Sequence, residues 1–253
     1  MGKTIAIANQ KGGVAKTTTA VNLGAWLSLM GQKVLLIDAD PQGNATTGVG
    51  VDKEAVENCM YDVMINKIPV VEAVIPSAVD NLAILPATIE LAGAEIELVG
   101  ITEREHVLKK ALAAVKESYD FIFIDCPPSL GLLTINALTA ADSLLIPIQC
   151  EYYALEGLGQ LLNTFQRVQQ NLNRDLVLEG VLLTMFDGRT NLSIQVVDEV
   201  KKYFKDKVFR SIVPRNVRLS EAPSHGKPVM VYDRRSRGSE VYHELAKEVM
   251  GID

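Results

Sequence analysis

The sequence predicts an α/β fold, in which a mainly parallel, twisted sheet is covered by helices on both faces. Short apolar runs alternate with longer segments whose apolar residues recur at helical spacing. The runs are apolar at nearly every position, as expected for strands that are buried on both faces. No linker, repeat or low-complexity segment interrupts the 253 residues, so residues 1–253 are predicted to form a single domain.

The elements follow from these runs in chain order. The expected strands cover residues 5–8, 33–38, 81–86, 120–125, 143–148, 176–184 and 208–213. The expected helices begin at Lys16 and then cover residues 56–65, 103–118, 154–171, 192–204 and 239–250. The remainder of residues 45–80 is predicted to be irregular, and residues 229–232 form a short segment of unassigned type.

Composition indicates an ordinary protein of the cytoplasm. Hydrophobic residues make up 48% of the chain and charged residues 22%. No apolar run approaches the roughly 18 residues that a membrane-spanning helix needs. Three scattered cysteines, Cys59, Cys126 and Cys150, are too few for a disulfide framework or a zinc site, and Cys126 and Cys150 are expected to be buried.

Charge is unevenly distributed along the chain. The net charge is −6, yet residues 189–237 contain twelve Lys or Arg and five Asp or Glu, a local net of +7. The remaining residues therefore carry −13. Such a basic segment is compatible with a polyanionic partner, and equally with a solvated charged face.

The segment around which the chain is organised is AIANQKGGVAKTTT, residues 6–19. A buried strand, a glycine turn and a helix together describe a P-loop, whose backbone N–H groups and helix dipole bind phosphate. Lys16 is expected on the outer phosphates and the Thr17 hydroxyl on Mg²⁺. The strict pattern G-x-x-x-x-G-K-[ST] fails at both glycines, where Gln10 and Ala15 stand. The alternative is an ordinary turn.

Carboxylates follow two other strands. Asp38 and Asp125 each end an apolar run, and Asp40 lies in the turn-rich loop after the first of these runs. Ligands of parallel sheets bind at the carboxyl ends of the strands, so the P-loop and these loops should face one crevice. Asp125 has the Walker B arrangement for a metal beside the phosphates, and Asp40 is placed to hold an attacking water. The alternative role is to cap the following helices.

Five segments carry a family resemblance: residues 11–18, 38–44, 124–129, 149–157 and 214–226. With them the chain resembles the ParA/MinD-type ATPases with a deviant Walker A motif, most closely the short chromosomal ParA proteins of the Soj group. The resemblance covers essentially the whole chain. It implies a P-loop NTPase fold and an ATPase that acts as a slow, partner-stimulated switch in chromosome partition.

The resemblance also implies a sandwich dimer with two ATP molecules between the protomers. Lys11 would reach the phosphates of the partner, Asp40 would position the hydrolytic water, and Glu151 would lie near the partner's side of the nucleotide. The implied catalytic residues are Lys11, Lys16 and Asp40, and the implied ligands of Mg²⁺ are Thr17, Asp40 and Asp125. The implied residues for ATP or ADP are Lys11, Gly12, Gly13, Val14, Ala15, Lys16, Thr17, Thr18, Pro214 and Asn216.

Two macromolecular partners are implied by the same resemblance. The ATP dimer would bind double-stranded DNA without sequence preference, which implies association with the nucleoid. A ParB-type protein would stimulate hydrolysis and release the dimer. The implied DNA contacts are Arg189 and Arg218, with Lys201, Lys202 and Arg215 as further candidates.

Ala15 departs from the family, which has glycine at this position. The residue before the P-loop lysine often has positive φ, which in alanine costs about 1–2 kcal/mol. The methyl group also points toward the phosphates and the facing protomer. The chain is therefore predicted to bind nucleotide but to dimerise or hydrolyse poorly.

Three rival functions are considered. A MinD-like division-site ATPase needs a basic amphipathic C-terminal helix, whereas residues 243–253 contain three acidic residues and one lysine. An iron–sulfur ATPase needs two cysteines per protomer to meet across a dimer axis. A nucleotide-binding module with little hydrolysis is compatible with Ala15. The three histidines, His106, His225 and His243, show no metal-ligand spacing.

Overall fold

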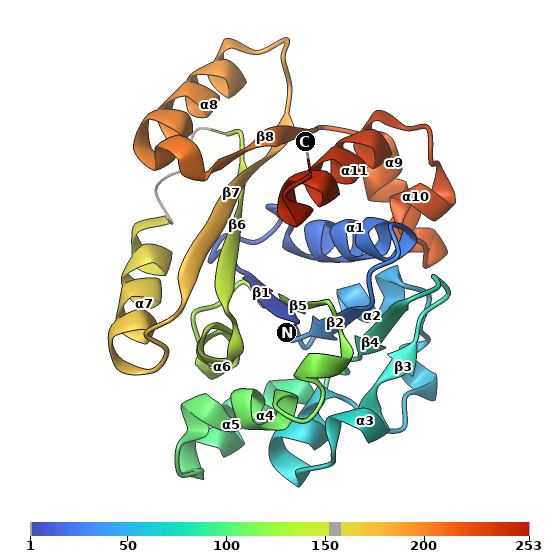
Figure 1. The fold of residues 1–253 in the computed structure, drawn as a ribbon, viewed down its shortest axis with the longest axis vertical. Helices are drawn as coiled ribbons and strands as arrows, with labels where there is room; N and C mark the ends of the chain where they lie inside the picture. Colours follow the sequence, from blue (N-terminus) through green and yellow to red (C-terminus); the bar gives the residue numbers. More distant parts are fainter. Residues whose placement is uncertain (1, 152–157, 253) are drawn as a thin grey trace.

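The chain folds around one eight-stranded sheet in the order β3-β4-β2-β5-β1-β6-β7-β8 (Figure 1). The computed structural model describes residues 2–151 and 158–252. All neighbouring strands are parallel except β3 and β4. The strands are β1 (Lys3–Ile7), β2 (Val34–Asp38), β3 (Ile75–Pro76), β4 (Leu82–Leu85), β5 (Phe121–Asp125), β6 (Ser143–Gln149), β7 (Val177–Phe186) and β8 (Val208–Pro214).

Helices cover both faces of this sheet. The α-helices are α1 (Lys16–Leu29), α2 (Asn44–Gly48), α3 (Val70–Ala73), α4 (Leu91–Glu97), α5 (Val107–Leu112), α6 (Leu132–Ala140), α7 (Leu158–Asn171), α8 (Asn191–Phe204), α9 (Val217–Glu221), α10 (Val229–Tyr232) and α11 (Arg237–Met250). Shorter turns are η1 (Lys53–Ala55), η2 (Asp62–Asn66), η3 (Leu98–Gly100), η4 (Arg104–His106), η5 (Lys116–Ser118), η6 (Lys205–Lys207) and η7 (Ala222–His225).

The two faces hold separate hydrophobic cores. In β1, Ile5 and Ile7 point into the core beneath α1 and α11, whereas Ala6 points into the core beneath α6. Figure 1 shows α1 and α11 on one side of the sheet and α6 and α7 on the other. Because both faces are covered, the central strands are apolar throughout, which confirms the predicted fold class. No helix in the described ranges is long and apolar enough to cross a bilayer.

Several predicted elements were wrong in extent or type. The helix expected over residues 103–118 is divided into η4, α5 and η5. Asn136 of α6 causes the division at its start, because its side chain donates to the Arg104 carbonyl and accepts from the Leu108 N–H. Glu103, with φ 55, has a left-handed backbone there. The expected helix 56–65 is confined to the π-helical turn η2.

Other differences are smaller. Residues 229–232 form a helix, α10, and helices α2, α3, α4, α6 and α9 and the strand β3 were not predicted. Gly93 in the middle of α4 weakens the sequence signal for that helix. The start of the helix predicted over residues 154–171 lies outside the described residues, and α7 covers the rest of it. Cys126 and Cys150 are buried, as predicted.

Candidate functional site

The loop between β1 and α1 forms an anion-binding cradle. Gly13 and Ala15 both have φ 71, so the positive φ expected at the residue before Lys16 is confirmed. Ala15 is the N-cap of α1 and offers no side-chain oxygen to the first N–H groups of the helix. These N–H groups and the positive end of the helix dipole therefore remain available to an anion.

Neighbouring strands fix this loop in place. Asn9 accepts from the Lys11 N–H (3.0 Å) and donates its amide to the Pro147 carbonyl (2.7 Å). Thr184, buried in β7, donates its hydroxyl to the Val14 carbonyl (3.1 Å). Thr184 was missed from the sequence, because a single hydroxyl in an apolar strand carries no sign that the fold brings it under the loop.

Lys16 lies inside the cradle and is only 6% exposed. Its ammonium donates to the Lys11 carbonyl (3.1 Å). Burial lowers the pKa of Lys16, and the charges of Asp125, Cys126 and Asp40 oppose that shift. The lysine is thus a buried cation that faces the two sequence-predicted carboxylates of the site, which suits it to stabilise phosphate charge.

Asp38 and Asp125 lie side by side at the ends of β2 and β5, which pair in register at these two residues. Asp38 has a structural role, since its carboxylate accepts from both the N–H and the hydroxyl of Thr46 (2.8 Å each). Burial raises the pKa of Asp38 to about 6. The carboxylate is therefore already engaged in holding the start of α2.

Asp125 is different, because neither of its buried oxygens accepts a hydrogen bond of ordinary geometry from the described residues, although the Thr17 hydroxyl is close enough to lower its pKa. Burial raises the pKa of Asp125 well above its usual range, the charge of Asp38 raises it further, and Thr17 and Lys16 oppose the shift. A buried carboxylate without a donor is costly unless a cation compensates it. Asp125 and the Thr17 hydroxyl are oxygen donors of the kind that Mg²⁺ binds, so these residues fit a magnesium ion.

Asp40 lies in the loop after β2, at the same edge of the sheet. Its N–H donates to Asp38 (3.2 Å), and its carboxylate accepts from the Gln42 N–H (2.9 Å). Asp40 is near enough to Lys16 to raise the pKa of that lysine, although less than Asp125 does. The structure therefore brings Asp40, Lys16 and Asp125 together, as the strand ends predicted.

Lys11 occupies the mouth of the loop in a different environment. Its side chain is 36% exposed and its ammonium lies 3.8 Å from a carboxylate oxygen of Glu151. The other oxygen of Glu151 accepts from Arg215 at 3.0 Å. Lys11 thus shares an exposed acidic partner, Glu151, with Arg215, which follows β8.

Pro214 and Asn216 lie at the carboxyl end of β8, three places along the sheet from β1. Asn216 caps α9, because its side-chain oxygen accepts from the Arg218 N–H (2.9 Å). Among the described residues, neither Pro214 nor Asn216 makes a hydrogen bond to the phosphate loop. The structure places them at the same edge of the sheet but does not bring them into the cradle.

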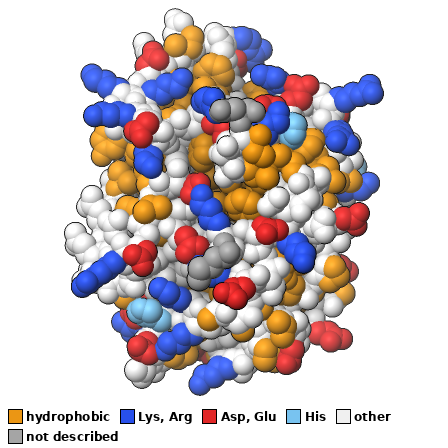
Figure 2. Space-filling model, in the orientation of Figure 1, with side chains coloured by type: hydrophobic (Ala, Val, Ile, Leu, Met, Phe, Trp, Pro, Cys, Tyr) orange, Lys and Arg blue, Asp and Glu red, His pale blue; other side chains and the backbone are white. Residues whose placement is uncertain are grey.

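The basic candidates are spread over one region rather than gathered into a patch. Arg189 precedes α8 and pairs with Asp187 (2.7 Å), and Arg218 in α9 pairs with Glu221 (2.8 Å). Lys201 and Lys202 lie in the last turn of α8 and are exposed. Figure 2 shows Lys and Arg interspersed with Asp and Glu across this face. The bare charge count therefore overstates the local positive field.

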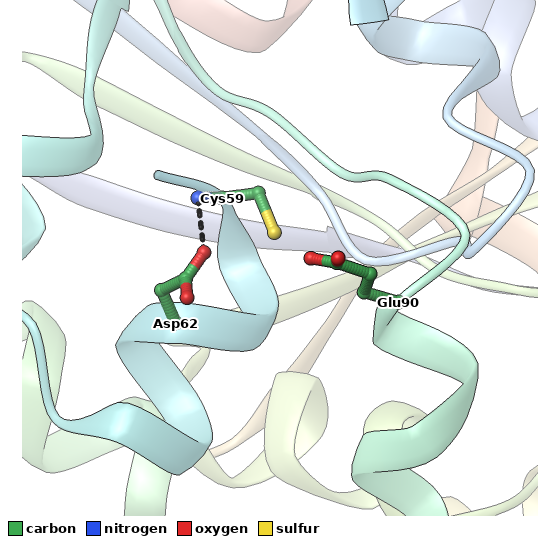
Figure 3. A group of neighbouring side chains, drawn as sticks. All are labelled: Cys59, Asp62 and Glu90. Atoms are coloured by element: carbon green, nitrogen blue, oxygen red, sulfur yellow. Dashed lines mark hydrogen bonds between the residues drawn. The ribbon is translucent and has the colours of Figure 1, made fainter. Parts of the chain in front are cut away.

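A further cluster, Cys59, Asp62 and Glu90, was not predicted (Figure 3). One ligand atom from each residue lies within 4.8 Å of the others. Asp62 accepts from the Cys59 N–H (2.9 Å) and from the Asn66 amide (2.9 Å), so its carboxylate stabilises the turn η2. Burial raises the pKa of the Cys59 thiol, which disfavours the thiolate that a metal needs. The cluster thus has a structural explanation.

Comparison with known proteins gives consistent relationships. Residues 2–178 match the model of a family described as an AAA domain. The chain is 67% identical to the sporulation initiation inhibitor protein Soj of Bacillus subtilis, over 98% of each chain. It is 54% identical to the chromosome partitioning protein ParA of Myxococcus xanthus, over 100% of this chain and 89% of that one.

A solved structure shares the fold in detail. It is named cobyrinic acid a,c-diamide synthase, comes from Mycobacterium smegmatis and contains ADP and magnesium. It superposes with a TM-score of 0.88 at 39% identity and covers 99% of this chain and 94% of its own. The higher identity to Soj and ParA, over nearly the full length, decides the assignment. The chain belongs to the ParA/Soj family of chromosome-partitioning ATPases.

Proposed function

We propose that residues 1–253 form one P-loop ATPase domain that works as an ATP-driven switch in chromosome partition. The observation that carries the proposal is that the charge of Asp125 acts on Lys16, which is buried at an uncapped helix start, while the Asp125 carboxylate accepts no hydrogen bond of ordinary geometry from the described residues. A buried cation and a buried carboxylate beside the same loop suit a magnesium nucleotide, with the phosphates on the helix N-terminus. The related structure with ADP and magnesium supports the same choice of ligand.

Within one protomer, the residues have separate roles in the proposal. The backbone of Lys11, Gly12, Gly13, Val14 and Ala15 surrounds the phosphates, with Lys16, Thr17 and Thr18 at the helix start. Thr17, Asp40 and Asp125 would hold Mg²⁺, which would neutralise phosphate charge. Asp40 orients the hydrolytic water from its exposed loop. Pro214 and Asn216 contact the adenine from the end of β8.

Lys11 acts between protomers in this proposal. Its side chain is 36% exposed at the mouth of the loop, so it is accessible to a second copy. A cation that arrives only on dimerisation stabilises transition-state charge only in the dimer, as arginine fingers do. Glu151 is its partner within the single chain, and that contact at 3.8 Å is weak enough to exchange.

The proposed partners are non-specific double-stranded DNA and a ParB-type protein, with the chain in the cytoplasm and on the nucleoid. Arg189, Arg215, Arg218, Lys201 and Lys202 are the proposed DNA contacts. Membrane binding through the last helix is not proposed, because α11 buries Tyr242, Leu245 and Ala246 against the core. Its apolar face is therefore unavailable to lipid.

A second candidate is a nucleotide-binding module with little hydrolysis. The backbone of Ala15 favours this second function, because an alanine rather than a glycine has to adopt the positive φ of 71. In that case ATP binds and the sandwich dimer forms poorly.

ATP turnover decides between these two functions. It is measured for the chain alone, with duplex DNA, and with DNA plus the N-terminal peptide of a ParB protein. The switch predicts slow basal turnover that rises with the peptide. The switch is excluded if the chain binds ATP but its turnover stays at the level of an Asp40→Ala variant under all three conditions. The nucleotide-binding module would then be the remaining function.

A further inference from the structure

A second cavity lies away from the nucleotide site, between η2, α3 and α5 at the lower end of Figure 1. We name it the α3–α5 cavity, and its volume is about 420 Å³. Its walls are mainly apolar and include Val63, Met64 and Val70, all buried, with Val107 and Ala111 of α5. This size lies within the range of small-molecule pockets, about 300–1,000 Å³.

The backbone around this cavity is unusual at three points. The turn η2 is a π-helix, a form that is rare and frequent at functional sites. Lys67 (φ 60) and Glu103 (φ 55) are both left-handed, although neither is glycine, and both line the cavity. Strained residues persist where the surroundings hold them, and they cluster at ligand sites. Here the two left-handed residues are charged and belong to the lining of a mainly apolar cavity.

The charge at the rim is unbalanced. Lys110 and Glu103 pair with each other at 2.6 Å. Within the part of the chain that the structure describes, the ammonium of Lys67 forms no ion pair. The charged residues of the lining are therefore Lys67, Lys110 and Glu103, which leaves a net charge of +1 on a protein whose net charge is −6. A ligand that matches has an apolar body and one negative group at its end.

We propose that the α3–α5 cavity binds a small carboxylate with an apolar tail, such as a medium-chain fatty acid. The tail packs against Met64, Val70 and Val107, and the carboxylate meets Lys67. Apolar contact supplies most of the affinity and the charge-assisted contact supplies the selectivity for an acid. The site is separate from the proposed nucleotide chemistry and does not depend on it.

Calorimetric titration with decanoate below its micellar concentration tests the proposal, with decylammonium as the probe of opposite charge. One molecule of decanoate should bind per chain. Decylammonium should bind at least about tenfold more weakly than decanoate. Lys67→Gln should weaken decanoate by about five- to tenfold. The matched control is Lys109→Gln, an exposed lysine of α5 outside the lining, which should leave binding unchanged.

A second variant tests the apolar part of the site. Ala111→Phe fills the cavity and should abolish binding of decanoate, while circular dichroism confirms that the variant is folded. The proposal is overturned if decanoate shows no saturable binding to the unsubstituted chain. It is equally overturned by equal binding of decylammonium, or by binding to folded Ala111→Phe that matches that of the unsubstituted chain.

Discussion

Ala15 is the residue that stands where the strict P-loop pattern G-x-x-x-x-G-K-[ST] has its second glycine. It holds φ 71 and ψ 32, a left-handed conformation that costs an alanine about 1–2 kcal/mol. The conformation nevertheless persists, because the following residues enter α1 and their N–H groups face the cradle. The strain therefore lies in the phosphate-binding loop itself, where a small shift of the backbone moves the N–H groups that would bind phosphate.

Replacing Ala15 with glycine should raise both ATP-dependent dimerisation and turnover. Glycine adopts the left-handed conformation freely, and its lack of a methyl group clears the space toward the facing protomer. Size-exclusion chromatography with ATP and a phosphate-release assay measure the two effects. Ala25→Gly, in the right-handed interior of the same helix, is the matched control and should lower stability without raising turnover. Equal turnover in Ala15→Gly and the unsubstituted chain would remove Ala15 as a cause of impairment.

At the scale of the elements, the divided helix at residues 104–118 depends on Asn136. This buried side chain accepts from the Leu108 N–H (3.1 Å) and donates to the Arg104 carbonyl (2.8 Å). Asn136→Ala leaves the buried Leu108 N–H without this partner, at a cost of about 1–3 kcal/mol, and removes the donor to the part-buried Arg104 carbonyl. The midpoint of urea unfolding should fall accordingly. Asn171→Ala, at the exposed end of α7, should cause little change, and equal losses in both variants would refute the capping role.

The same helix shows what the sequence alone could and could not provide. Strands were predictable because burial on both faces makes them apolar throughout, and Asp125 was found because it ends such a run. The break in the helix was not predictable, since Asn136 lies about 30 residues downstream of Arg104 and Leu108. The loop contact of Thr184 is also non-local. Local sequence patterns thus located the candidate site. The residues that hold its loops in place could be identified only from the three-dimensional structure.

At the scale of the whole molecule, the acidic chain is proposed to bind DNA as a dimer through a dispersed basic region. Arg189→Ala should weaken DNA binding in ATP and reduce its dependence on salt, because each lost phosphate contact lowers the slope by about one. Fluorescence anisotropy at several salt concentrations gives both quantities. Arg174→Ala, an exposed arginine outside residues 189–237, is the control. The same slope in both variants would exclude Arg189 from the interface.

The central claim is that each catalytic site combines Asp40 of one protomer with Lys11 of the other. ATP turnover of a mixture of Lys11→Ala and Asp40→Ala chains tests it most directly, with Ala15→Gly present in both. Each variant alone should be nearly inactive. In a mixed dimer, the Lys11→Ala protomer retains its own Asp40 and receives Lys11 from its partner, so one site is complete. Turnover should recover clearly on mixing, and a mixture no more active than its separate components would contradict a site shared between protomers.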